Sequence, residues 1–200
     1  VVVHPSSNVV YMTWTQFDAY ASPNPKDSSF ILFSKSIDRG VSWTDPIRIS
    51  KFGGDCLDGD NTVEGAVPAL GENGEIYVAW SGPRGLVFQK SLDYGKTWLK
   101  EEKVISEHSG GWEFSIPGMN RANGLPFLVS DMSEGKNKGT LYLNWADQKN
   151  GKNNTDVWLK SSKDGGETWS AAIMVNQDKT KKHQFFTSIA IDQSNGDLHF

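Results

Sequence analysis

The sequence has few of the features that mark several common protein classes. It contains one cysteine, Cys56, so it can form no internal disulfide, and no catalytic signature surrounds this residue. The formal net charge is −4 and the lysines are scattered, so we expect no nucleic-acid binding, even at the small basic cluster of residues 179–183. No apolar run approaches the roughly 18 residues that a membrane span needs. The sequence therefore points away from membrane-spanning, nucleic-acid-binding and disulfide-rich proteins.

Helical patterning is also missing from the chain. No stretch shows sustained apolar spacing at i, i+3 and i+4, whereas aromatic residues make up 12% of the sequence and there are 20 glycines. Short strands joined by turns are typical of such a composition. We therefore expect an all-β fold.

One turn motif of eight residues occurs three times. Each copy fits Ser-x-Asp-x-Gly-x-x-Trp and follows a short apolar run. The Ser and Asp side chains can bond backbone N–H groups a few residues on, Gly supplies a positive φ, and Trp brings a large apolar surface. We name these motifs the Ser–Asp turns and expect a structural role for them. Their defining residues are Ser36, Asp38, Gly40 and Trp43, then Ser91, Asp93, Gly95 and Trp98, and finally Ser162, Asp164, Gly166 and Trp169.

The repeat extends beyond the turn. Residues 1–14 align without a gap with residues 67–80, and their Tyr-x-x-Trp pattern recurs at 142–145. Each unit is interpreted as four strands: one ending in a polar turn, the Tyr-x-x-Trp strand, the apolar strand before the Ser–Asp turn, and a last strand. A repeated unit of four antiparallel strands is the blade of a β-propeller, with a β-sandwich of the same hairpins as the alternative. The last strands are expected at residues 46–50, 99–105 and 172–176.

The predicted blade units span about residues 1–50, 62–105 and 119–176, with the start of another at 183–200. About three blades are fewer than the roughly four to eight with which propellers close. We therefore expect residues 1–200 to form a partial propeller whose partners include the remaining blades of the same ring.

Chain direction separates the short turns from the longer loops. The Ser–Asp turns and the turns after the first strand of each unit belong to one face, which we name the turn face. The loops between second and third strands, and the connections between units, belong to the opposite face, the loop face. Because these loops are longer and less alike, we predict that any functional site lies there.

One loop of the loop face is rich in acidic residues. It carries Asp55, Asp58, Asp60 and, at its end, Glu64. The aspartates could coordinate calcium through oxygen ligands, although their spacing does not fit an EF-hand, or could supply catalytic acids, or could simply be solvated. Glu64 opens a strand that approaches the channel axis, and we therefore select it as a catalytic candidate.

Several other loop-face residues have no role in the repeat. Trp112 could stack on a sugar ring or could fold onto the base of its loop. Arg121 could bind a ligand carboxylate by two hydrogen bonds or pair with a neighbouring acid. Arg84, Asp147 and His183 are further binding candidates. No serine nucleophile elbow, His-Glu-x-x-His motif or phosphate-binding glycine loop is present, and we expect no cofactor.

Through its Ser–Asp turns the chain resembles the sialidase-like β-propellers, in which this motif is called the Asp-box or bacterial neuraminidase repeat. The resemblance implies six blades and a retaining glycosidase with three carboxylate-binding arginines, a Tyr nucleophile activated by a Glu, and an Asp as acid/base. Asp27 is the nearest match to that Asp. The Arg-Ile-Pro motif of the family is matched only by Ala66-Val67-Pro68, which has alanine in place of the arginine.

Two functions remain open at this point. The first is a secreted or periplasmic sialidase-like hydrolase that removes terminal sugars from glycans, as the Ser–Asp turns and the acidic loop indicate. The second is a non-catalytic propeller that binds glycan or protein, as Ala66 and the shortage of loop-face arginines indicate. Carbohydrate or glycoconjugate is the expected ligand.

Overall fold

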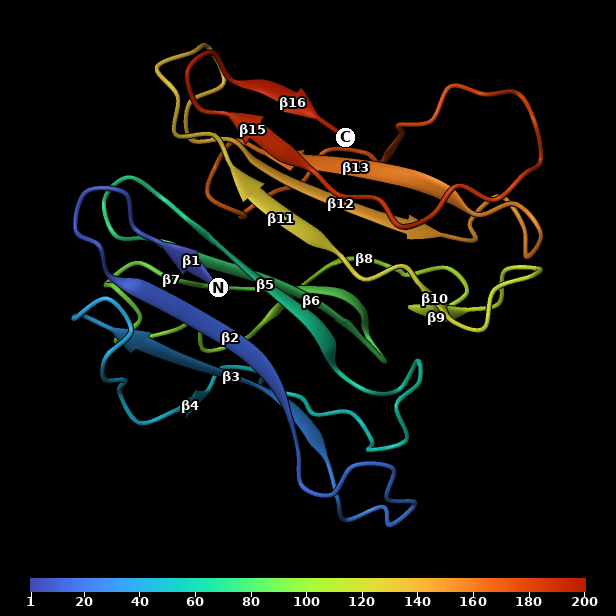
Figure 1. Cartoon of the computed structure of the whole chain (residues 1–200), viewed down its shortest axis with the longest axis horizontal. Helices are drawn as coiled ribbons and strands as arrows, with labels where there is room; N and C mark the ends of the chain where they lie inside the picture. Colours follow the sequence, from blue (N-terminus) through green and yellow to red (C-terminus); the bar gives the residue numbers. More distant parts are fainter.

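The computed structural model describes all 200 residues and consists of strands, turns and loops (Figure 1). Three four-stranded antiparallel sheets follow one another along the chain, each with its strands in sequence order. The fold contains no helix that could cross a membrane. The predicted all-β fold, with the four-stranded antiparallel blades of a β-propeller, is confirmed.

The strand boundaries follow the predicted order of four strands in each unit. The first sheet is built from β1 (Val2–Val3), β2 (Val10–Phe17), β3 (Ser29–Ser36) and β4 (Ile47–Arg48). The second contains β5 (Glu64–Leu70), β6 (Ile76–Gly82), β7 (Gly85–Ser91) and β8 (Lys103–Ser106). The third contains β11 (Phe127–Ser130), β12 (Leu141–Asp147), β13 (Asp156–Ser162) and β14 (Ile173–Met174). Two short hairpins add β9 (Glu113–Phe114) with β10 (Ala122–Asn123), and β15 (Ala190–Asp192) with β16 (Asp197–His199).

Two details differ from expectation. The last strand of each sheet is shorter than predicted, because it is an edge strand that pairs with one neighbour only, and β4 and β14 each form two residue pairs with theirs. The β9–β10 hairpin lies in a connection for which no strand was predicted. The sequences of its two short strands are not part of the repeated unit, so the repeat could not predict them.

The sheets pack against one another through their apolar faces. Trp80 is fully buried in the core shared with the first sheet, and Trp145 in the core shared by the second and third sheets. At the centre, β5 contacts both β1 and β11, so the first strands of the units lie side by side. This arrangement places the loops that follow each second strand together at one end of the molecule.

The Ser–Asp turns are closed by their own side chains. In the third turn, Ser162 Oγ accepts a hydrogen bond from the Gly166 N–H at 2.8 Å, and Asp164 Oδ1 accepts one from the Thr168 N–H at 2.9 Å. The first and second turns repeat both bonds. These aspartates are therefore acceptors within the turn, as the predicted structural role requires.

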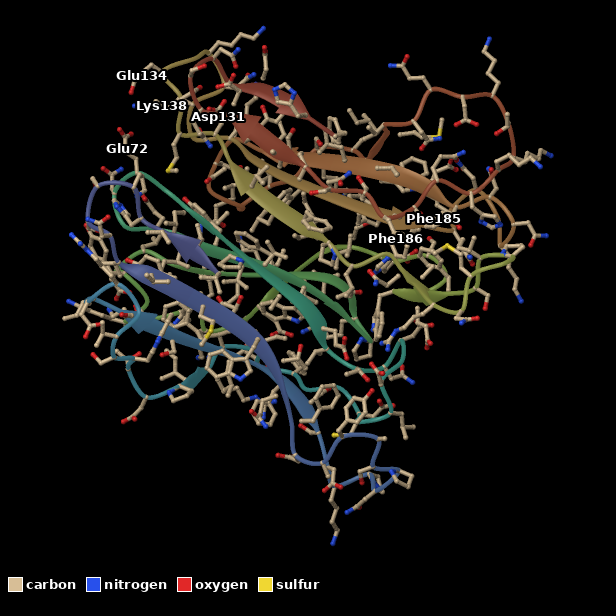
Figure 2. All side chains as sticks on the ribbon, viewed as in Figure 1. Glu72, Asp131, Glu134, Lys138, Phe185 and Phe186 are labelled. Carbon is tan, nitrogen blue, oxygen red and sulfur yellow. The ribbon has the colours of Figure 1, made fainter.

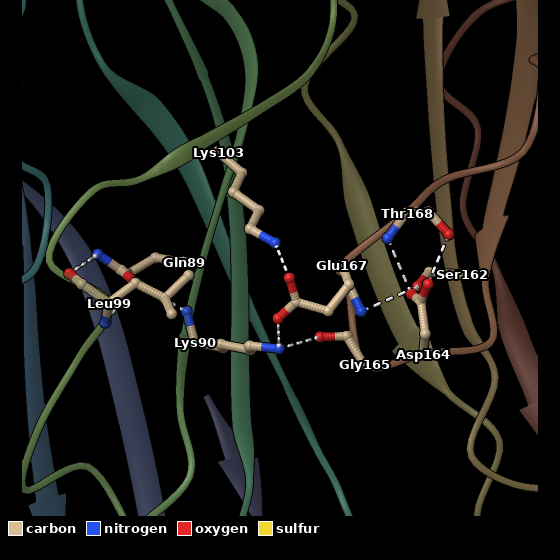
Figure 3. A network of polar contacts seen from close by, with 10 residues as sticks. Gln89, Lys90, Leu99, Lys103, Ser162, Asp164, Gly165, Glu167 and Thr168 are labelled. Atoms are coloured by element: carbon tan, nitrogen blue, oxygen red, sulfur yellow. Dashed lines mark hydrogen bonds and ion pairs between the residues drawn. The ribbon is translucent and has the colours of Figure 1, made fainter.

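The second and third Ser–Asp turns also pack on the preceding sheet. The Trp169 ring meets the Phe88 ring edge-on, with 5.6 Å between centroids. Lys90 Nζ donates to the Gly165 carbonyl at 2.8 Å and pairs with Glu167 at 2.6 Å (Figure 3). The second turn repeats this contact on the first sheet, where Trp98 meets Phe33 and Lys35 donates to the Tyr94 carbonyl. Each of these turns is thus held by the sheet before it.

Candidate functional site

Four charged or polar side chains, from three loops and the start of β5, meet on the loop face. Tyr20, in the loop between β2 and β3, donates its hydroxyl hydrogen bond to Asp58 Oδ2 at 2.5 Å. Arg121 Nη2 donates to the other oxygen of Asp58 at 3.0 Å. Glu64, the first residue of β5, lies close enough to share a hydrogen bond with Asp58. We name these four residues the acid–tyrosine cluster.

The sheet positions Glu64 by two features of β5. The pairing of β5 with β6 shifts register between Glu64 and Val67, and Gly65 has a φ of 72° there. Such a bulge changes the direction of a side chain at the end of a strand. Thr15 Oγ1 of β2 donates to the Val63 carbonyl at 3.0 Å, which fixes the neighbouring backbone to the first sheet.

The two carboxyl groups of the cluster have opposite acidities. Burial raises the pKa of Glu64 to about 7, and the negative charge of Asp58 and the hydrogen bond between them add to this effect. Burial would also raise the pKa of Asp58, but hydrogen bonds from Tyr20 and Arg121 and the positive charge of Arg121 outweigh it and lower that pKa. Glu64 therefore holds its proton at pH values below about 7 and exchanges it near neutral pH, while Asp58 is ionised.

Tyr20 and Arg121 complete the chemistry of the cluster. The hydrogen bond to Asp58 raises the pKa of Tyr20, so its hydroxyl is a proton donor to that carboxylate. The same carboxylate raises the pKa of Arg121, which remains a cation. The cluster thus combines a carboxylic acid, a carboxylate base, a hydroxyl group and a guanidinium group, a set suited to acid–base and nucleophilic catalysis.

The β9–β10 hairpin covers one side of the cluster. The Glu113 N–H donates to Asp60 Oδ1 at 2.8 Å, and the Glu113 charge contributes to the raised pKa of Glu64. Trp112 anchors the hairpin: it is 1% exposed, and its indole N–H donates to the Thr62 carbonyl at 3.3 Å. The prediction that Trp112 stacks on a sugar is therefore wrong, because the ring is buried at the base of its loop.

Two hollows lie on either side of β10. One, of about 410 Å³, is mostly polar, and Arg121 and Lys152 line it. The other, of about 340 Å³, is half apolar, and its lining includes Asn123, Leu125 and Phe186. Since Arg121 and Asn123 flank the buried Ala122, the two hollows are neighbours on the loop face.

Two predicted binding residues, Arg84 and Asp147, have other partners. Arg84 pairs with the buried Glu102 at 3.2 Å and lies over the ring of Phe52. Asp147 is buried, where it accepts hydrogen bonds from the Trp145 indole at 2.9 Å and from the Lys149 N–H at 3.0 Å. The predicted ligand contact of Asp147 is wrong, because its carboxylate closes a turn at the end of β12.

His183 and Asp27 form hydrogen bonds with other residues and none with the acid–tyrosine cluster. His183 Nδ1 is 2.9 Å from Thr155 Oγ1. The Asp27 carboxylate accepts hydrogen bonds from Ser22 Oγ at 2.5 Å and from Asn24 Nδ2 at 3.5 Å, all within its own loop. Asp58, rather than Asp27, is the carboxylate that the structure brings to Glu64.

The aspartates considered for calcium do not converge. Asp55 Oδ1 accepts hydrogen bonds from the Leu57 N–H at 3.0 Å and the Thr62 hydroxyl at 3.2 Å. Asp58 and Asp60 face Tyr20 and the Glu113 N–H respectively. No three acidic, His or Cys side chains in the chain are grouped so that they could hold a metal ion.

A buried histidine joins the second and third sheets beneath the loop face. Ser81 Oγ is 2.7 Å from His108 Nδ1, and His108 Nε2 is 3.0 Å from the Ala146 carbonyl. Since a carbonyl only accepts, the Nε2 atom carries the hydrogen and the serine donates to Nδ1. Burial lowers the pKa of His108. Ser81 is itself buried, so this pair is a structural link and not an accessible nucleophile.

Sequence reasoning missed Tyr20, although a signal for it was present. The chain has five tyrosines. Tyr11, Tyr77 and Tyr142 belong to the Tyr-x-x-Trp strands and Tyr94 to a Ser–Asp turn, which leaves Tyr20 without a role in the repeat. The elimination that selected Trp112 among the tryptophans would have selected Tyr20 among the tyrosines.

No family model and no curated protein matches the chain. The NanB sialidase of Streptococcus pneumoniae is a similar solved structure, with 21% identity and a TM-score of 0.48 over 82% of this chain and 22% of that one. An intramolecular trans-sialidase of Ruminococcus gnavus has 16% identity and a TM-score of 0.49, over 85% and 36% of the two chains. A Hadza microbial sialidase has 17% identity and a TM-score of 0.37, over 88% and 44%. The chain thus spans less than half the length of these structures, and the similarity carries no argument about activity.

Proposed function

We propose that this chain carries the catalytic side chains of a retaining glycoside hydrolase that removes terminal sugars from glycans. The observation that supports this function is the acid–tyrosine cluster. Its two adjacent carboxyl groups differ in acidity, with the pKa of Glu64 raised to about 7 and that of Asp58 lowered. Glycosidases divide proton donation and charge stabilisation between two carboxyl groups in the same way.

Each member of the cluster has a role in this reaction. Tyr20 Oη attacks the anomeric carbon, and its proton passes to Asp58, which already accepts its hydrogen bond at 2.5 Å. Protonated Glu64 donates its proton to the oxygen of the departing group as the glycosidic bond breaks. A water molecule then attacks the anomeric carbon, Glu64 takes up its proton, and Tyr20 leaves and recovers its proton from Asp58.

The polar hollow beside the cluster supports an acidic terminal sugar as substrate. Arg121 uses one nitrogen for Asp58 and lines the hollow together with Lys152. A guanidinium group and an ammonium group on one hollow suit a sugar carboxylate. A secreted or periplasmic location, where glycans are encountered, belongs to the same proposal.

Hydrolysis of a fluorogenic sialoside and of a panel of p-nitrophenyl glycosides by the protein tests this function. We expect release of the aglycone, and a decrease of at least about 100-fold in kcat for Tyr20→Phe, which removes the nucleophile. Tyr94→Phe, on the turn face, is the matched control and should keep the wild-type rate. An unchanged rate for Tyr20→Phe would exclude the proposed nucleophile.

A second function, glycan binding without cleavage, is favoured by one specific observation. Ala66 occupies the position where the family resemblance expects a substrate-binding arginine, and Arg121 is already paired with Asp58. Saturable binding of sialosides without release of sugar from any glycoside of the panel would establish this function instead.

A further inference from the structure

Asparagine is followed directly by glycine at four places in the chain, which are Asn73, Asn123, Asn150 and Asn195. This dipeptide can modify itself, because the absence of a Cβ on the glycine lets the glycine backbone nitrogen reach the asparagine side chain. The attack needs a glycine N–H and a carboxamide that are both free to move. The hydrogen bonds around the four sites therefore determine which of them can react.

At three of the four sites the fold holds both reacting groups. The N–H groups of Gly124, Gly151 and Gly196 donate to backbone carbonyls at 2.8, 2.9 and 2.7 Å. The side chains of the asparagines before them are bonded as well, to the Leu125 N–H, the Asp156 carboxylate and the Asp197 carboxylate respectively. A reaction at any of these sites has to break hydrogen bonds first.

The site at Asn73 differs from the other three in both respects. Asn73 is exposed in the turn between β5 and β6, where its backbone N–H donates to Glu75 Oε2 at 2.8 Å and its side chain has no hydrogen-bond partner. The Gly74 carbonyl accepts a hydrogen bond from the Tyr94 N–H at 3.1 Å, but the Gly74 N–H has no acceptor. The second sheet already has a sheet on each side, so the exposure of this turn does not depend on further blades.

We propose that Asn73 is a site of spontaneous deamidation, which converts it to aspartate and isoaspartate. After the Gly74 N–H has lost its proton to hydroxide, the nitrogen attacks Asn73 Cγ. The new N–C bond forms as the bond from Cγ to the side-chain nitrogen breaks, and that nitrogen leaves as ammonia. Water then opens the cyclic imide at one of its two carbonyl groups, which gives aspartate, or isoaspartate in which the backbone continues through the side chain.

Deamidation adds a carboxylate to a hollow of the turn face that is already acidic. The hollow has a volume of about 270 Å³ and lies between the second and third sheets, and its lining includes Glu72, Asn73 and Asp131. Lys138 is the one cation that lines it, and its ammonium group pairs with Glu72 at 3.0 Å and with Glu134 at 2.8 Å. Figure 2 shows these labelled charged side chains together at one end of the sheets. The reaction therefore adds negative charge where one ammonium group already serves two carboxylates.

Peptide mapping by mass spectrometry tests the proposal, because the four Asn-Gly sites lie in four different tryptic peptides. During incubation of the folded protein at mildly alkaline pH, we expect deamidation at Asn73 to be at least about 10-fold faster than at the other three sites, where hydrogen bonds must break first. Labelling by isoaspartate methyltransferase should increase with time and should be largely lost in Asn73→Gln, whose longer side chain closes the ring more slowly. An added Cβ at Gly74 would lie 2.3 Å from the Tyr94 ring, so the informative variant changes Asn73 and not Gly74.

The same incubation in guanidinium chloride is the control. Unfolding removes the hydrogen bonds that distinguish the sites, so all four should then react at similar rates. Equal rates at the four sites of the folded protein, a faster reaction at another site, or no reaction at Asn73 would each overturn the proposal. A preference for Asn73 that is as large in the unfolded chain would overturn it too, because the cause would then be the local sequence and not the fold.

Discussion

Two carboxyl groups of this molecule, Asp93 on the turn face and Glu64 on the loop face, have opposite shifts in acidity. On the turn face, Asp93 accepts hydrogen bonds from the Thr97 hydroxyl and backbone and from Ser91, and these bonds lower its pKa to about 2. On the loop face, burial and the neighbouring Asp58 raise the pKa of Glu64 to about 7. A carboxylate surrounded by hydrogen-bond donors remains an ionised acceptor, whereas one that is buried beside a second carboxylate can exchange a proton near neutral pH. The difference shows that the number of acidic residues is a poor guide to a catalytic site. The burial and the hydrogen-bond partners of each carboxyl group determine whether it can exchange a proton near neutral pH.

The largest expected effect tests the loop-face member of this comparison. Glu64→Gln removes the proton donor, and kcat for sialoside hydrolysis should decrease by about 100-fold or more. In the wild type the rate should fall as the pH rises past about 7, because Glu64 then loses its proton. Glu113→Gln removes a nearby charge but no proposed catalytic group, and should change the rate by less than about 3-fold. Full activity of Glu64→Gln would show that Glu64, like the aspartates of the turn face, takes no part in catalysis.

The next effect is a difference in stability between a Ser–Asp turn that packs on the preceding sheet and one that does not. An added Cβ at Gly166 would lie 2.3 Å from the Phe88 ring, whereas at Gly40 it would meet only its own turn's Trp43 at 3.9 Å. Both glycines have a positive φ, so each alanine variant should lose about 1–2 kcal/mol. Gly166→Ala should lose about 1–3 kcal/mol more because of overpacking. Urea unfolding measures the difference, and equal losses would show that packing on the preceding sheet adds nothing.

A smaller effect concerns the pH dependence of stability. The pKa of Glu64 is higher in the folded protein than its usual 4.5, so the folded state gains stability from its proton at low pH and loses that gain as the pH rises through about 7. Asp93 behaves in the opposite way, contributing above about pH 4 and losing its contribution as the pH falls toward 2. Melting temperatures of Glu64→Gln relative to wild type should therefore rise between pH 5 and about 8. A flat difference would contradict the raised pKa.

The smallest effect distinguishes Asp27 from Glu64. Asp27→Asn alters hydrogen bonds within one exposed loop and should change kcat by less than about 2-fold, which the same sialoside assay can measure. A loss as large as that of Glu64→Gln would instead return Asp27 to the acid/base role that the family resemblance implies.

The turn face could be predicted from the sequence because its interactions are local. Every hydrogen bond that closes the third Ser–Asp turn joins residues at most four positions apart. The same motif read three times gave the strand order and the all-β propeller fold. The lengths of the edge strands were overestimated because a pattern of apolar residues does not show how many of them pair with a neighbouring strand.

The acid–tyrosine cluster could be predicted only in part. Asp58 is separated from Tyr20 by 38 positions and from Arg121 by 63, and no local pattern links them. Glu64 was selected because it opens a strand near the channel axis, and Arg121 because it lies outside the repeat. For Arg121, the alternative of pairing with a neighbouring acid is what the structure shows. Trp112 was selected by the same argument and is buried, so absence from the repeat indicates a special role without distinguishing a binding residue from an anchor.

The contact of Lys90 with Gly165 and Glu167 has a consequence for synthesis of the protein. The second and third Ser–Asp turns each pack on the sheet that precedes them in the chain, so that sheet emerges from the ribosome before the turn that covers it. Each new sheet can therefore pack on a sheet that has already folded, before later residues are synthesised. The apolar surface that the growing chain exposes is then about that of one sheet at a time. The order of the repeats would then also be the order of assembly.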